Sequence, residues 1–411
     1  MKNSVSPNRS IVSPEQRSAA LVDRRNRKMA QSAHAFVRGT TARFYQWLAS
    51  RHAPVLPDGP DVWICGDCHL GNLGPLADGR GNVDILIRDF DQAAWGNPSF
   101  DVCRLALSLS VLARSSDLPG MATAHILERL LLGYEMAFPE KPKTAPSMPP
   151  LLRMKVLRAH RRTSKILMRE RTGDDTLKLP LGCHFWPLWR QERNALDDMF
   201  QMPSVLELVT QAKKHSSQGS IHLADAAYWR KGCSSLGNSR YAVLLEVTSS
   251  SRGTEDWCLM DIKEAGPALV PVRSNASHAI SDHGSRVVKA ATQLSPHLGL
   301  RMQSTHMLGK SFFVRQLMPQ DMKLDIRSLR PGSAGELAVY LGYILGRAHM
   351  RQMSPDIRQA WKKDLNRARR KSVDAPSWLW DATVGLLADL EAAYLEHCRR
   401  HVMGTFRRRM G

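Results

Sequence analysis

A β-rich stretch at residues 222–318 is flanked on both sides by long segments of helical periodicity, and this arrangement limits the folds open to the chain. Three apolar runs inside it predict strands at 240–247, 256–263 and 311–317, with one helix at 284–294. Apolar spacing predicts a helix over 27–50, and helical spacing returns from residue 333. We therefore predict an α+β fold in which a helical part is split around a β-rich part.

Changes in composition divide the 411 residues into five segments. A polar leader precedes a helical segment, and a Pro-rich linker then leads into a basic helical insertion. A β-rich lobe and a second helical segment follow. The predicted bounds are 1–26, 27–140, 141–220, 221–320 and 321–411.

Charge is the unusual feature of the composition: 58 Lys and Arg against 38 Asp and Glu give a net charge of +20. Such a surface attracts polyanions, whether nucleic acid or an anionic substrate, although solvated basic helix faces explain the same number. The sequence contains no apolar run long enough to cross a membrane and no signal peptide. Its seven cysteines are scattered. We therefore expect a cytoplasmic protein.

The most informative polar residues lie between positions 61 and 91. Strands are predicted at 61–65 and 82–87, with a turn-forming cluster at 78–82 between them. Asp67 and Asn72 are five residues apart, and Asp89 follows the second strand. Phosphoryl transfer from Mg-ATP requires a carboxylate beside the attacking hydroxyl, and an amide and a second carboxylate on the metal. The pattern predicts Asp67 as the base and Asn72 and Asp89 as metal ligands.

A competing motif overlaps this one. Cys65 and Cys68 form a Cys-x-x-Cys pair after a strand, which is typical of redox sites and, together with His69, of zinc sites. The remaining cysteines are isolated, and the Gly- and Pro-containing run 70–75 breaks the helix that a thioredoxin-like motif needs.

The β-rich segment contains candidates for nucleotide binding. A Gly/Ser loop between two predicted strands could let backbone N–H groups approach phosphates, and its candidate residues are Gly232, Ser235 and Gly237. Lys263 ends an alternating strand, where a lysine could reach the α- and β-phosphates. The backbone at Gln316 and Leu317 is a candidate hinge for the adenine. An ordinary hairpin and a surface lysine are the purely structural alternatives.

Taken together, these motifs resemble the protein-kinase-like superfamily, most closely its aminoglycoside-phosphotransferase branch. Cys65-Gly-Asp67-Cys-His69-Leu-Gly-Asn72 is similar to the catalytic loop of that branch, and Arg88-Asp89-Phe-Asp91-Gln-Ala93 to its metal strand. The resemblance implies a two-lobed kinase-like fold that binds ATP and Mg²⁺. It also implies supporting roles for the polar residues around the loop: His69, Asp91, Asp101 (placed to cap a helix at 102–113) and Arg104.

The order of the parts differs from that of ordinary kinases, because Lys263 follows Asp67 instead of preceding it. This order resembles a circular permutation. From about residue 27 to 400, the chain is similar to a bacterial group, domain-of-unknown-function family 2252. The motifs that carry this similarity are Phe36-Val-Arg38-Gly39, Lys263-Glu264-Ala265, Val314 to Leu317, and Gly342 to His349.

Lys289 departs from that group, whose members often have a glutamate there to pair with the lysine. Glu264 or Glu246 would then have to substitute. We predict an Mg-ATP-dependent phosphotransferase with an unidentified, anionic acceptor, and the same residues would also serve transfer of AMP. The alternatives are a nucleotide-binding pseudokinase without turnover and a basic nucleic-acid-binding protein.

Overall fold

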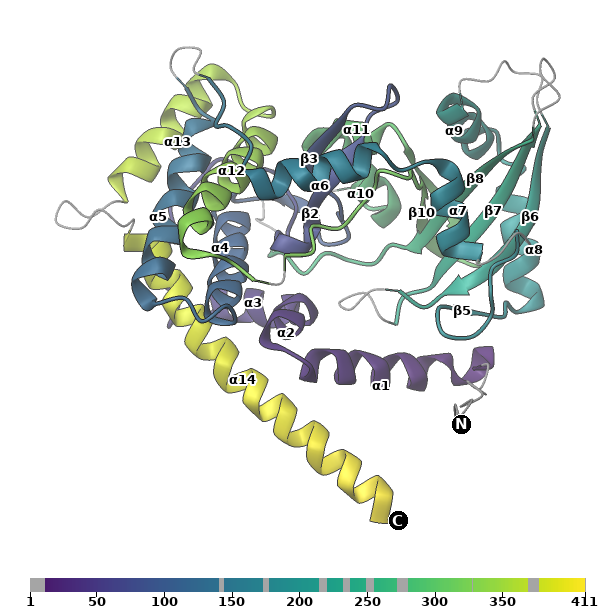
Figure 1. Ribbon diagram of the computed structural model, residues 1–411, viewed down its shortest axis with the longest axis horizontal. Coiled ribbons are helices and arrows are strands. Elements are labelled where there is room, and N and C mark those ends of the chain that lie inside the picture. The colour runs from purple at the N-terminus through teal and green to yellow at the C-terminus, as the bar shows by residue number, and fades with distance from the viewer. Residues whose placement is uncertain are drawn as a thin grey trace, which may run out of the picture. The chain divides into compact units, whose positions relative to one another are not determined.

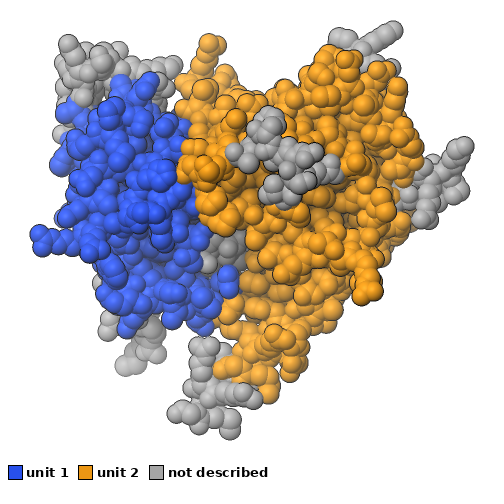
Figure 2. All heavy atoms as spheres, turned by 180° about the vertical axis from the view of Figure 1, so that it is seen from behind, with its two compact units in different colours: residues 1–25, 163–265, 301–319 blue, residues 26–162, 266–300, 320–411 orange. Residues whose placement is uncertain are grey.

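The computed structural model describes residues 12–139, 144–172, 177–213, 220–231, 237–248, 255–271, 280–326, 328–368 and 377–410. Contacts divide the chain into two compact units, each assembled from separate stretches of sequence (Figure 2). Unit 1 comprises residues 1–25, 163–265 and 301–319, and unit 2 comprises 26–162, 266–300 and 320–411. Both units contain helices and strands, so the fold is α+β, as predicted.

Unit 1 is built on one antiparallel sheet (Figure 1). Its strands are β5 (Phe185–Trp186), β6 (Ser220–Trp229), β7 (Arg240–Thr248), β8 (Glu255–Glu264), β9 (Met302–Met307) and β10 (Lys310–Gln316). They lie in the order β5-β6-β7-β8-β10-β9. The helices of this unit are α1 (Arg17–Ala30, which continues into unit 2), α7 (Ser164–Thr172), α8 (Arg190–Met199) and α9 (Pro203–Lys213), preceded by a 3-10 turn at Pro14–Gln16. The three predicted strands are confirmed.

Both faces of this sheet are covered, which explains why its central strands are so apolar. Met260 and Ile262 of β8 lie in one apolar cluster together with Leu196 of α8. Leu259 belongs to a second cluster, with Leu167 of α7. Alternate residues of β8 therefore face opposite sides of the sheet, as expected for a β-strand.

The leader and the basic insertion differ from their predicted descriptions. Helix α1 begins inside the predicted leader, and buried Arg17 forms an ion pair with Glu192 of α8 at 2.7 Å. The insertion is divided between the units: α6 (Pro150–His160) belongs to unit 2, whereas α7, β5, α8 and α9 belong to unit 1.

Unit 2 is mainly helical, with two small two-stranded sheets. Besides α6, its helices are α2 (Ala33–Gly39), α3 (Thr41–Leu48), α4 (Ser99–Arg114), α5 (Gly120–Met136), α10 (His283–Leu294), α11 (Pro296–Gly299), α12 (Pro331–Met350), α13 (Pro355–Arg367) and α14 (Ser377–Met410). Its strands are β1 (Val62–Ile64), β2 (Leu73–Ala77), β3 (Val83–Ile87) and β4 (Ala94–Gly96). The single helix predicted over 27–50 is wrong. The chain breaks after α1 and again at Thr40, where the hydroxyl bonds back to the Phe36 carbonyl oxygen at 2.8 Å.

The hairpin around residues 78–82 exists, but its first strand is not the predicted one. β3 pairs with β2, with Leu73 opposite Ile87, while β1 pairs with β4. The turn is closed by Asp78, whose carboxylate accepts hydrogen bonds from the backbone N–H groups of Arg80 and Asn82. β2 was missed because it contains a glycine and a proline, residues that weaken or interrupt strands.

Helices α5 and α12 approach each other closely at glycines. A Cβ atom on Gly133 of α5 would overlap the Val339 carbonyl oxygen of α12, and one on Gly342 of α12 would overlap the Leu130 carbonyl oxygen of α5. Glycine is therefore required at both positions for this packing distance. The contact matters for the site, because α12 carries His349 near its end.

In the described part of the chain, no helix combines the length and apolar character needed to span a membrane.

Replacing Gly342 by alanine should destabilise unit 2 by about 1–3 kcal/mol or more, because the added methyl group meets backbone that cannot move aside. Gly332→Ala, in the first turn of the same helix and with no atom within 4 Å of the added Cβ, should be neutral or stabilising by up to about 1 kcal/mol. Denaturant unfolding of both variants measures the difference. Equal stabilities would contradict the close packing.

Candidate functional site

The loop between β1 and β2 contains Asp67 and is held by the Asp101 carboxylate. Asp101 is fully buried, and its two oxygens accept hydrogen bonds from the backbone N–H groups of Cys65 at 2.7 Å and Gly66 at 2.9 Å. Gly66 has a φ of +72°, and a Cβ there would overlap a neighbouring backbone carbonyl oxygen. The prediction that Asp101 caps a helix at 102–113 is wrong. The residue lies inside the first turn of α4, and its carboxylate holds the loop instead.

Asp101 is the end of a buried chain of hydrogen bonds that also contains His349, Tyr134 and Trp361. His349 Nε2 lies 3.2 Å from Asp101, and its Nδ1 lies 3.0 Å from the Tyr134 hydroxyl. Trp361 Nε1 donates to that hydroxyl at 3.2 Å. Because an indole N–H can only donate, the Tyr134 hydroxyl accepts from Trp361, and its own proton can be donated to His349 Nδ1. In that arrangement Nε2 carries the proton that faces Asp101.

Of these residues, His349 was within reach of sequence reasoning, because it ends the motif that begins at Gly342. Tyr134 and Trp361 had no sequence signal, since nothing local distinguishes a network member from an ordinary core aromatic.

Asp67 is 5% exposed and forms a buried ion pair with Arg104, whose Nε donates to Oδ1 at 2.8 Å. Arg104 is 1% exposed and also donates to the Val37 carbonyl oxygen at 2.6 Å, which fixes the guanidinium. Burial raises the pKa of Asp67 above its usual value and the charge of Asp89 adds to this rise, while Arg104 acts in the opposite direction. Arg104 thus fixes the carboxylate and favours its charged form.

Asn72 faces the same loop with a defined amide orientation. Its Nδ2 donates to the Asp67 carbonyl oxygen at 2.8 Å, so its Oδ1 is the atom left to accept or to bind a cation. The side chain is 9% exposed. The hydrogen bond between Asn72 Nδ2 and the Asp67 carbonyl oxygen therefore closes the loop across the five-residue spacing.

Asp89 is brought to this loop by the β2–β3 hairpin. The Arg88 N–H donates to the Asn72 carbonyl oxygen at 2.8 Å, and the Cys65 thiol donates to the Asp89 carbonyl oxygen at 3.4 Å. Asp89 and Asp91 are both half-buried. Among the described residues, no group of three or more His, Cys, Asp or Glu side chains is arranged to bind a metal ion. Asn72 and Asp89 form a candidate pair of a different kind, with one amide and one carboxylate.

His69 is 3% exposed, and its Nε2 lies 3.8 Å from the second oxygen of Asp67. Burial lowers the pKa of His69 well below its usual value, and the positive charges of Arg38 and Arg104 lower it further. The ring is therefore neutral at physiological pH, and its contact with Asp67 is not an ion pair.

Cys65 and Cys68 are both free thiols with no exposed surface. A hydrogen bond donated to Cys68 and burial raise the pKa of Cys65 well above its usual value. A hydrogen bond from Cys65 lowers the pKa of Cys68, but burial and the charges of Asp101 and Asp67 raise it on balance. A redox or zinc site needs an accessible thiolate, and these surroundings disfavour one.

In unit 1, Lys263 of β8 is 3% exposed and in register with Arg240 of β7. Glu264 is engaged elsewhere: it accepts from the Ser239 N–H at 2.8 Å and pairs with Lys310 at 3.0 Å. Because consecutive strand residues point to opposite faces, Glu264 does not share a face with Lys263.

Glu246 cannot pair with Lys263 either. It lies six residues along β7 from Arg240, the residue opposite Lys263, which is roughly 20 Å at about 3.3 Å per residue. The carboxylate on the Lys263 face is Asp261, which the alternation predicts for that face but which was not predicted as a site residue. Arg240 donates to its two oxygens at 2.7 and 2.5 Å, and Arg315 lies 3.8 Å away. Burial opposes the charged form, but these arginines outweigh it and hold the pKa of Asp261 well below its usual range.

The remaining nucleotide-binding candidates are only partly described. Gly232 and Ser235 lie outside the described residues, while Gly237 is exposed with a φ of +121°. At the candidate hinge, the Gln316 N–H donates to the Arg301 carbonyl oxygen at 3.1 Å, and the Leu317 N–H donates to Leu259 at 2.9 Å. Both N–H groups are therefore used within unit 1.

One family matches the sequence: residues 17–400 match the model described as "Uncharacterized protein conserved in bacteria (DUF2252)". The chain belongs to the DUF2252 family. Searches of curated proteins and of solved structures return no match.

In this DUF2252 protein, Lys289 is exposed on α10, a helix of unit 2. The buried face of α10 carries Arg286 instead, which donates to the carbonyl oxygens of Asp91 at 2.9 Å, Gly266 at 2.8 Å, and Ala93. The cation that α10 contributes to the neighbourhood of the Asp89 segment is therefore Arg286, whereas Lys289 is a surface residue.

We expect Arg104→Gln to destabilise the DUF2252 protein by about 3–5 kcal/mol, because it leaves the buried Asp67 carboxylate without its cation. Arg114→Gln on the same helix removes an exposed pair with Glu391 at 3.6 Å and should cost no more than about 1 kcal/mol. Denaturant unfolding at pH 7 compares the two variants, and similar losses would contradict the assignment of Arg104 as the residue that holds Asp67.

Proposed function

We propose that this protein is an Mg-ATP-dependent phosphotransferase with a circularly permuted, two-lobed protein-kinase-like fold. The observation that carries the proposal is the Asn72 amide, whose nitrogen donates to the Asp67 carbonyl oxygen and leaves Oδ1 for a cation. The β2–β3 hairpin brings the second ligand, Asp89, to the same loop. Oxygen donors of this type suit Mg²⁺, which usually takes one or two protein ligands and completes its shell with phosphates and water.

The donor set fits the ion, because Asp89 is a half-buried carboxylate and the Asn72 amide uses its nitrogen, not its oxygen, on the Asp67 carbonyl. Bound there, Mg²⁺ would offset the charge of the triphosphate. The protein groups supply orientation: Arg104 holds Oδ1 of Asp67, so the other oxygen is available to accept a proton from an acceptor hydroxyl.

Unit 1 supports the same proposal. In protein kinases a Gly-rich loop covers the phosphates and a lysine on the third strand contacts them. Here β6, β7 and β8 are consecutive antiparallel strands, the Gly/Ser loop joins the first two, and Lys263 lies on the third. In the proposed permutation, this β-rich part follows the catalytic loop instead of preceding it.

The groups next to Asp67 favour an anionic acceptor. Arg38 Nε and His69 Nδ1 are buried atoms without a hydrogen-bond partner. Both lie beside Gly71, at 3.2 Å from where a Cβ of that residue would be. A phosphate or carboxylate on the acceptor would satisfy both donors, provided that the neutral His69 ring carries its proton on Nδ1.

The first test is a thermal shift with ATP and Mg²⁺ on wild type, Asn72→Ala and Asp89→Ala. Binding at about 100 times Kd stabilises the wild type by about 2.7 kcal/mol, seen as an increase in Tm. Both variants should lose the part of the increase that EDTA also removes. Asp364→Ala, a surface carboxylate paired with Arg367 at 3.2 Å, should behave as wild type. An Mg²⁺-dependent increase that persists in Asp89→Ala would end the metal assignment.

The second test separates catalysis from binding. Asp67→Asn should keep the Mg-ATP thermal shift but lower nucleotide turnover about 10²–10⁴-fold, because the proton acceptor is lost. Release of ADP indicates phosphoryl transfer and release of AMP indicates nucleotidyl transfer, measured with a pool of small phosphorylated and carboxylated acceptors. A wild-type protein that binds Mg-ATP but releases neither product would instead be a pseudokinase.

A further inference from the structure

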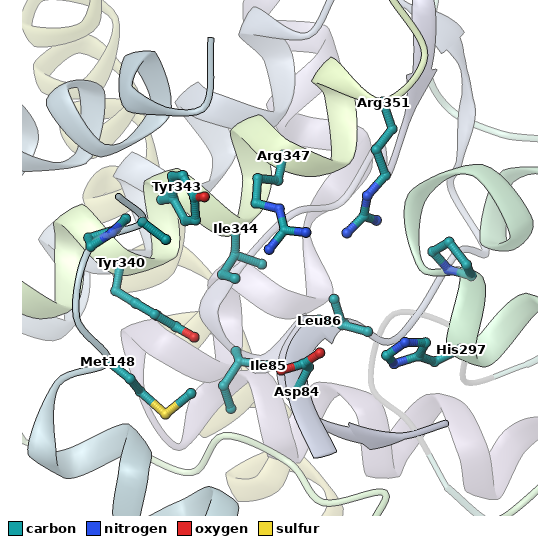
Figure 3. Close-up of a pocket in the computed structure, with 13 residues that line it drawn as sticks. Asp84, Ile85, Leu86, Met148, His297, Tyr340, Tyr343, Ile344, Arg347 and Arg351 are labelled. Atoms are coloured by element: carbon teal, nitrogen blue, oxygen red, sulfur yellow. The ribbon is translucent and has the colours of Figure 1, made fainter. Parts of the chain in front are cut away.

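A cavity of about 400 Å³ lies within unit 2, apart from the Asp67 loop (Figure 3). Its walls come from β3, α11, α12 and the segment before α6. The lining side chains that bear on its chemistry are Asp84, His297, Tyr340, Tyr343, Arg347 and Arg351. Cavities of this size hold small organic ligands.

Arg347 in the last turn of α12 and Arg351, the residue directly after this helix, give the cavity a cationic wall. The guanidinium groups of Arg347 and Arg351 both point into it in Figure 3. In the part of the chain that the structure describes, neither forms an ion pair. Arg347 lies over the Tyr343 ring at 5.8 Å, and Arg351 donates to the Leu294 carbonyl oxygen at 3.3 Å. Both side chains are exposed, and like charges at this spacing repel each other. Partial burial and the charge of Arg347 lower the pKa of Arg351, while Asp84 acts in the opposite direction.

The other walls offer hydrogen-bonding groups of both kinds. Tyr340 is buried, and burial together with the charge of Asp84 raises its pKa to about 12, so its hydroxyl is neutral at physiological pH. The Asp84 carboxylate is exposed on β3, which forms another wall of the cavity. A ligand therefore meets two cations on one wall, and an acceptor on another.

We propose that this cavity binds a small organic phosphate monoester whose other end carries a hydroxyl or amino group. Two guanidinium charges match a phosphate dianion better than a single carboxylate, and their N–H groups approach it from two positions along the helix. The hydroxyl or amino end donates to Asp84. None of these residues belongs to the candidate catalytic loop, so the site goes beyond the proposed phosphotransferase function.

The experiment is isothermal titration of glycerol phosphate into wild type and variants, in EDTA at fixed ionic strength. Arg347→Gln and Arg351→Gln should each weaken binding about tenfold, since a hydrogen bond to a charged group contributes about 1.5–3 kcal/mol. Arg330→Gln, an exposed arginine at the start of α12, removes the same charge and should change Kd less than twofold. Asp84→Asn keeps an acceptor but removes the opposing charge, and should tighten binding. A gain of this kind cannot arise from misfolding.

Several outcomes would overturn the proposal. These are no binding to wild type at millimolar ligand, an Arg347→Gln/Arg351→Gln double variant within twofold of wild type, or equal weakening by Arg330→Gln. Malonate binding as tightly as glycerol phosphate would overturn the phosphate assignment. Titration of Asn72→Ala/Asp89→Ala separates the two sites, because binding must persist there even if the proposed catalytic function fails. Loss of binding in that variant would place the ligand at the Asp67 loop.

Discussion

Helix α4 holds the candidate catalytic loop through two buried polar contacts one turn apart. Asp101 accepts from the backbone of Cys65 and Gly66, and Arg104 binds the Asp67 side chain. Buried charges are tolerated only when they are paired and hydrogen-bonded. Asp101 therefore requires the N–H groups of the loop, and Arg104 requires the Asp67 carboxylate. One rigid helix thereby fixes both the path of the loop and the direction of its carboxylate, and the position of Asn72 follows from its bond to the Asp67 carbonyl oxygen.

Sequence reasoning predicted the elements whose signal is local. The strands around 240–247 and 256–263 and the helix around 284–294 are continuous apolar or amphipathic runs, and all three are confirmed. It failed where partners are distant in sequence. Nothing near 61–65 indicates that β1 pairs with β4, and Gly74 and Pro75 hide β2 from strand propensity. Asp101 looked like a helix cap because short polar residues before apolar runs usually are.

For the candidate site, the spacing of residues along the sequence predicted contacts within the Asp67 loop but not contacts with residues outside it. The interval between Asp67 and Asn72 reflects one closed turn, which is a local property. The partners of His349 depend on how α5, α12 and α13 pack, and Lys263 acquires Arg240 as a neighbour only through sheet register. The period of two predicts Asp261 on the face of Lys263, which excludes Glu264, but finding Arg240 and Arg315 beside Asp261 required the neighbouring strands.

The distribution of arginines gives the net charge of +20 a structural meaning. Arg104, a fully buried arginine of unit 2, is paired with a carboxylate, as are Arg17 and Arg240 in unit 1, whereas buried Arg286 bonds to carbonyl oxygens. These pairs use acidic residues in the interior, so a chain with 20 more cations than anions has unpaired cations elsewhere. Most such groups on a surface are solvated at little cost. Arg347 and Arg351 are exposed as well, but they line one concave cavity, where an anion bound between them would relieve their mutual repulsion. The electrostatic rule that pairs Asp67 with Arg104 is thus also the basis of the anion site proposed for this cavity.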